Sequence, residues 1–132
     1  MKLTRMLPIM ALLLSGAAAL LAHHSFDAEY DRSKPISLKG TVTKVEFMNP
    51  HIWIYMNVTD DKGVTAWQVE GGAPNSLRRN GWSKDSVKQG ETITVDGSMS
   101  KDGSKTVNAT SVLAADGHRL FAGSSGGDGK AK

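Results

Sequence analysis

The chain has 132 residues, of which 16 are basic and 13 are acidic, so its formal net charge is +3. This length fits one domain with one hydrophobic core and leaves little room for a second. The sequence contains no cysteine. The absence of thiols excludes disulfides, thiolate metal sites and a cysteine nucleophile.

Residues 1–22 have the order of a cleavable secretory signal. A short positive stretch with Lys2 and Arg5 precedes an apolar run over residues 6–14, and small residues follow up to Ala22. This order is typical of signal peptides, and the apolar run is short for a bilayer span. The sequence therefore predicts a periplasmic or secreted protein that has no membrane attachment after cleavage.

Two cleavage points remain open. A cut after Ala19 fits the small-x-small rule, whereas a cut after Ala22 falls where apolar sequence stops and polar sequence begins. We prefer the cut after Ala22, which leaves 110 of the 132 residues and makes His23 the first. Because two basic residues leave with the signal, 14 basic residues then face 13 acidic ones, a net charge of +1. So small a charge provides no basic field and argues against nucleic acid as a partner.

The rest of the chain divides into three parts. Residues 23–35 are mostly polar, with Phe26 and Tyr30 as the larger apolar side chains, and we expect an extended N-terminal arm. Residues 36–122 carry the pattern of a β domain. Residues 123–132 are rich in glycine and serine, which predicts a flexible tail because little burial can offset the entropy of ordering it.

The first half of the domain predicts three strands. The first begins at Ile36, and its apolar phase slips after Gly40, which predicts a bulge that bends it. The second, residues 51–59, alternates apolar and polar side chains. A turn over residues 60–63 then leads into the third strand, residues 64–71.

The second half begins with a short helix and continues with strands. The helix covers residues 75–80 and stops at Gly81. Strands follow at residues 91–99 and 107–113, and a last short strand ends at Phe121. This order predicts an all-β fold, a small OB-like five- to six-stranded antiparallel barrel with one short helix between the third and fourth strands. A plain six-stranded antiparallel barrel or sandwich is the alternative.

Several motifs link the sequence to a known family. They are HHSF at residues 23–26, GTVTKVEF running into NPHIWIY within residues 40–55, WQVEGGAPNSLRRNGW at residues 67–82, and two late turns that contain DG. On these motifs the chain resembles an uncharacterised family of small exported bacterial proteins, a domain of unknown function, over residues 23–122. The resemblance implies export and a β-barrel, and it implies no activity. The chain departs from the family pattern at Met48, where an aromatic or small residue is expected before NPH.

Three of the four histidines suggest a copper site. As the first residue, His23 would chelate one metal ion through its amine and imidazole, and a second imidazole would complete the nitrogen-rich set, a histidine brace, that copper(II) prefers. His51 is the best candidate, because it follows Asn49 and a proline at the mouth of a strand. His24 is an alternative ligand, and Glu70 is a candidate partner that orients His51. If instead the terminus is frayed and His51 only caps a strand, no metal binds.

The second candidate site is aromatic. Trp53, Tyr55 and Trp67 are expected on the outer face of the second and third strands, where they would stack against a small molecule or a protein, or form a hydrophobic layer beneath the arm. No catalytic motif such as G-x-S-x-G or H-E-x-x-H occurs. We therefore expect a monomeric binding module for copper, in preference to an enzyme. The alternative is a metal-free interaction domain that binds a protein or small molecule through this aromatic face or through the NPH loop with Asn49. A copper-dependent oxidase is the least favoured interpretation.

Overall fold

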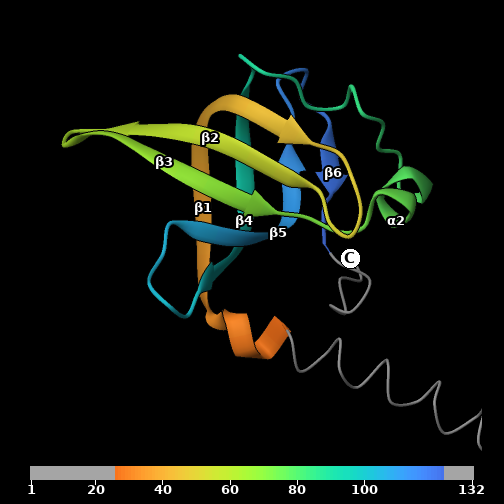
Figure 1. The fold of residues 1–132 in the computed structure, drawn as a ribbon. Coiled ribbons are helices and arrows are strands. Elements are labelled where there is room, and N and C mark those ends of the chain that lie inside the picture. Colours follow the sequence, from red (N-terminus) through yellow and green to blue (C-terminus); the bar gives the residue numbers. More distant parts are fainter. Residues whose placement is uncertain (1–25, 124–132) are drawn as a thin grey trace, which may run out of the picture.

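The computed structural model describes residues 26–123, and Figure 1 shows their arrangement. The proposed signal, His23, His24 and residues 124–132 lie outside the described residues. The elements have these bounds: β1 Tyr30–Glu46, β2 Trp53–Asp60, β3 Gly63–Glu70, α2 Pro74–Arg79, β4 Thr92–Ser100, β5 Thr106–Leu113 and β6 Arg119–Phe121. The predicted order of strands and helix is confirmed.

Five strands close into a barrel. Along the sheet the strands follow the order β3-β2-β1-β4-β5-β6, and β3 also pairs with β5. That closing pair is parallel and joins Gln68–Glu70 to Thr106–Asn108, whereas the other pairs are antiparallel. A long first strand shared between β2 and β4, with a helix between β3 and β4, is the arrangement of an OB-like barrel. The predicted fold class is therefore confirmed.

The bulge predicted in β1 after Gly40 is confirmed, and it lies a few residues beyond the glycine. The register between β1 and β2 shifts between Val42 and Lys44, so the irregularity lies after Gly40 and not at it. Gly40 serves a different purpose, since a Cβ there would lie 2.3 Å from the carbonyl oxygen of Asn57. The glycine permits a close approach of β1 and β2, and the bulge bends the strand farther on.

The barrel begins earlier than the sequence suggested. Residues 26–29 of the expected extended arm form a helical turn, and residues 30–35 are extended but belong to β1 of the barrel. Tyr30 pairs with Ser100 of β4, and its side chain is only 5% exposed. The register with β4 shifts between Asp31 and Pro35. The polar residues at this irregularity hide the strand from a periodicity argument, because they break the apolar alternation.

The core fills the barrel and extends beneath α2. The alternation predicted for the second strand is confirmed, since Ile52, Ile54 and Met56 are almost fully buried. Helix α2 buries Leu77, and after it the Trp82 indole Nε1 donates a hydrogen bond to the Phe121 carbonyl at 2.7 Å. Figure 1 shows α2 at one end of the β2–β3 hairpin and the tip of that hairpin extending away on the opposite side. Within residues 26–123 no helix is long and apolar enough to cross a membrane.

Candidate functional site

A buried carboxylate marks the end of β3. Glu70 is 8% exposed, and its backbone pairs with Trp53 of β2 on one side and Asn108 of β5 on the other. Taking a carboxylate out of water costs free energy unless hydrogen bonds replace the lost hydration. The two oxygens of Glu70 do find partners, and these partners come from segments far apart in the sequence.

The first partner is His51, in the loop before β2. Its Nδ1 lies 2.5 Å from Glu70 Oε1, and its side chain is 39% exposed. The expected contact between Glu70 and His51 is therefore confirmed. An ionised carboxylate only accepts hydrogen bonds, so Nδ1 carries the hydrogen and donates it. In the neutral imidazole Nε2 then has a free lone pair, which is the arrangement of a histidine that binds a metal ion.

The second partner is Tyr30, at the start of β1. Its hydroxyl donates a short hydrogen bond to Glu70 Oε2. Burial raises the pKa of Tyr30 far above its usual value, and the hydrogen bond and the charge of Glu70 act in the same direction. The phenol therefore stays protonated and remains a donor. Tyr30 was not among the predicted site residues, although a buried tyrosine hydroxyl ordinarily needs a polar partner.

Two glycines let the chain pass closely beside the site. Gly71 donates its N–H to the Ile52 carbonyl at 3.0 Å, and the Ile52 N–H donates to the Gly72 carbonyl at 3.0 Å. A Cβ on Gly71 would lie 2.6 Å from Ile52 Cγ1, and one on Gly72 would lie 2.6 Å from the Gly123 carbonyl oxygen. Because neither glycine has a side chain, the strand ends approach closely and Glu70 faces His51.

The NPH loop is exposed around His51. Asn49 is exposed, as is Met48, and the Asn49–Pro50 peptide bond is cis. Within residues 26–123 no group of three or more histidine or acidic side chains is placed to hold a metal ion. Of the predicted ligands, the described residues include only His51, and His23 and His24 lie outside them.

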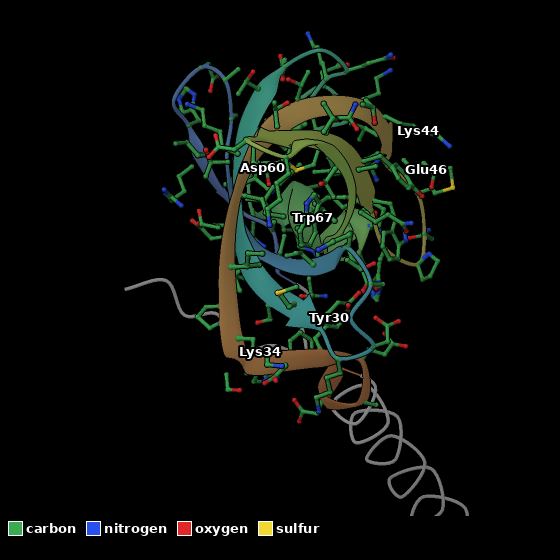
Figure 2. The ribbon with its side chains drawn as sticks, turned by 90° about the vertical axis from the view of Figure 1, so that its left-hand side faces the viewer. Tyr30, Lys34, Lys44, Glu46, Asp60 and Trp67 are labelled. Carbon is green, nitrogen blue, oxygen red and sulfur yellow. The ribbon has the colours of Figure 1, made fainter. Side chains whose placement is uncertain are left out.

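The aromatic residues do not share one face. Trp67 is 7% exposed and belongs to the core, so its predicted place on the outer face is wrong. It pairs with the buried Met56, and directly paired residues of an antiparallel ladder point to the same side. Figure 2 shows Trp67 inside the ring of strands, while Lys44 and Glu46 lie at its outside.

Trp53 and Tyr55 are both partly exposed and point to the other face of β2. The Tyr55 hydroxyl donates to Glu46 at 3.3 Å, and Lys44 Nζ lies 5.4 Å from the centre of the Tyr55 ring. These contacts hold Tyr55 against β1. What remains of the predicted aromatic site is a pair of half-exposed rings.

Comparisons with known proteins identify a family and distant structural likenesses. The model of the Family of unknown function (DUF6152) matches residues 11–109. A crystal structure of the ZRD-deleted mutant of TiaS in complex with agmatine is similar at 15% identity, covering 77% of this chain and 25% of that one, with a TM-score of 0.44. A crystal structure of yeast Stn1 and Ten1 is similar at 14% identity, covering 61% of this chain and 42% of that one, with a TM-score of 0.41. The search of curated proteins finds no match.

Proposed function

The chain belongs to the Family of unknown function (DUF6152), and we propose that it is an exported binding module that holds copper(II) between His23 and His51. The observation that carries the proposal is the 2.5 Å contact of Glu70 Oε1 with His51 Nδ1. This contact fixes the tautomer and the orientation of the ring, and it leaves Nε2 available to a metal ion. Nitrogen ligation of this kind suits copper(II), which also binds most tightly among the divalent first-row ions.

The proposed site also requires that the amino-terminal segment be long enough to bring His23 to His51. Tyr30 and His51 bind the two oxygens of one carboxylate, so the end of the Tyr30 side chain lies close to the imidazole. His23 stands seven positions before Tyr30. Residues 26–29 form a helical turn, so the reach beyond it comes from residues 23–25, which span about 10 Å at most when extended, still more than the width of a carboxylate. Cleavage after Ala22 would thus give an amino-terminal amine and imidazole that can return to His51, with His24 as a further ligand.

The chemistry of the site supports binding in preference to catalysis. The mature chain is small and carries a net charge of only +1 after loss of the signal. Three nitrogen ligands, two of them from one terminal residue, can complete a tetragonal copper site. We therefore propose a periplasmic or secreted monomer that binds or buffers copper.

The half-exposed aromatic pair carries a second candidate function. Trp53 and Tyr55 would contact a small molecule or a protein without any metal, since flat amphipathic rings gain much contact area at low entropic cost. Under this candidate, replacing Trp53 by alanine abolishes binding of that small molecule or protein, and removing the metal leaves this binding unchanged. The copper candidate expects the opposite pattern.

The deciding experiment tests the amino terminus directly. The precursor is expressed, the exported product is purified, and its first residues are sequenced. Copper(II) is then titrated into this protein and into a variant that carries Ala-Pro before His23, in which the proline has no backbone N–H and so prevents a chelate through the intervening backbone nitrogens. We expect the product to begin at His23 and the extension to weaken copper binding by more than about 100-fold, because it separates the terminal amine from the His23 imidazole. Equal affinity in the two proteins, or a product that begins at Leu20, would overturn the proposal.

A further inference from the structure

The segment nearest to His23 is fastened to the turn between β4 and β5. The backbone N–H of Lys101 donates to the Glu29 carbonyl at 2.8 Å, and Lys101 Nζ donates to the Asp27 carbonyl. Tyr30 then joins the ladder opposite Ser100. The start of the described chain is thus bound to the barrel by its backbone before β1 begins.

Side chains of the same segment pack on one another. The rings of Phe26 and Tyr30 lie 5.5 Å apart between centroids, and the guanidinium carbon of Arg32 lies 4.2 Å from the centre of the Phe26 ring. Arg32 Nε also donates to Asp27 Oδ1 at 3.1 Å. Most of these groups are exposed, so each contact by itself is weak. Tyr30 is the exception, because it is buried and its hydroxyl reaches across the barrel to Glu70.

We propose that Tyr30 is a positioning residue for the copper site. Through its hydrogen bond to Glu70 it holds the carboxylate against His51. The inference rests on the proposed function, and it adds that the Tyr30 phenol orients the His51 ligand through Glu70.

The Tyr30 hydroxyl can fix the Glu70 carboxylate because each oxygen of Glu70 has one strong hydrogen-bond partner. Without the phenol hydroxyl, Oε2 has lost its donor, and the carboxylate is free to rotate away from Nδ1 or to take up water. Outer groups of this kind change metal affinity by roughly 10- to 100-fold when they are removed, although they never touch the metal. The phenyl ring of a Tyr30→Phe protein keeps the packing against Phe26, so the substitution removes mainly the hydrogen bond.

The first test is a double-mutant cycle on copper(II) affinity. Tyr30→Phe is expected to weaken binding about 10-fold in the processed protein. In a Glu70→Ala background the same substitution is expected to have no further effect, because Tyr30 acts through Glu70. An equal fold-loss in both backgrounds would show a general structural role and overturn the inference.

A second measurement needs only the Tyr30→Phe protein, which covers the case in which Glu70→Ala does not fold. The electron paramagnetic resonance spectrum of the copper(II)-loaded protein is expected to keep its nitrogen hyperfine pattern while its lines broaden, because the same ligands are held in a wider range of orientations. An unchanged spectrum at unchanged affinity would overturn the role of Tyr30 and leave the His23–His51 site standing. Equal affinity in the variant with Ala-Pro before His23 would remove the site itself, so the two failures are distinguishable.

Discussion

Two histidine–carboxylate pairs in this barrel have similar chemistry and very different surroundings. His51 Nδ1 lies 2.5 Å from Glu70, and His118 Nδ1 lies 3.0 Å from Asp116. The side chain of Glu70 is 10% exposed and that of His51 is 39% exposed, whereas the side chains of Asp116 and His118 are 67% and 80% exposed. Proximity of a carboxylate to an imidazole is therefore shared by the two pairs, and burial is not.

The pairs also differ in what holds the carboxylate. Asp116 accepts a hydrogen bond from the backbone N–H of His118 at 3.0 Å, two residues along the same turn. Glu70 instead joins β3 to the loop before β2 and to the start of β1. A turn can make the first arrangement without any tertiary structure, but only the closed barrel makes the second. A histidine–carboxylate pair thus indicates an oriented ligand where distant elements fix the carboxylate.

The largest expected effect separates the two histidines by copper affinity. His51→Ala is expected to weaken copper(II) binding by more than the roughly 100-fold that bounds the loss of an outer group, because it removes a ligand. His118→Ala is the matched control, and its affinity is expected to equal that of the unchanged protein. Isothermal titration of both processed variants measures the difference. Equal losses in the two variants would show that the metal is held at an unspecific surface site.

A smaller effect is expected on stability, where removal of the Glu70 carboxylate should cost more than removal of the Asp116 carboxylate. Every buried side-chain nitrogen or oxygen of the described residues has a hydrogen-bond partner. Glu70→Ala would leave the hydroxyl of Tyr30 buried without one, which costs about 1–3 kcal/mol of the free energy of unfolding. Asp116→Ala is expected to change the stability far less, since its pair lies in water. Urea denaturation monitored by tryptophan fluorescence measures both.

Glu70→Gln provides the internal control for that experiment. The amide keeps an oxygen that can accept the hydrogen bond of Tyr30, so this variant should lose less stability than Glu70→Ala. If Glu70→Ala is as stable as the unchanged protein, water satisfies the Tyr30 hydroxyl, and the contrast between the buried and the exposed pair loses its energetic meaning.

Much of this architecture follows from periodicity in the sequence. The alternation of Ile52, Ile54 and Met56 predicts the buried face of β2, and the Gly81 stop predicts the end of α2, whose last helical residue is Arg79. The prediction of an outer face for Trp67 was wrong, although the sequence carries a signal for the core. Val69 stands two positions later, and residues two apart in a strand share one face. The alternation of faces along the third strand therefore places Trp67 in the core together with Val69.

The site could be predicted only in part. His51 and Glu70 were both identified as candidates, and whether they meet depends on the register of β2 and β3, in which Trp53 lies opposite Glu70. Tyr30 was missed because it lies 40 positions from Glu70 and is brought to it only when β3 and β5 close the barrel. Contacts of such long sequence separation leave no local pattern. The available hint was chemical, namely an aromatic hydroxyl in a polar segment.

The smallest expected effect concerns the exposed pair of His118 and Asp116. It tests whether the lowered pKa of Asp116 depends on the His118 imidazole. The backbone N–H of His118 lowers the pKa of Asp116 first, and the imidazole adds to this. His118→Ala keeps the backbone donor, so carbon-13 titration should still show the Asp116 pKa below its usual value near 3.8. A carboxyl whose pKa is lower in the folded than in the unfolded protein stabilises the fold at any pH above its unfolded pKa. This stabilisation is lost as the pH falls through the folded pKa, so both proteins should lose the small contribution of Asp116 in the same acidic range. A return of the Asp116 pKa to its usual value would make the imidazole essential in both pairs, and burial would no longer be what distinguishes them.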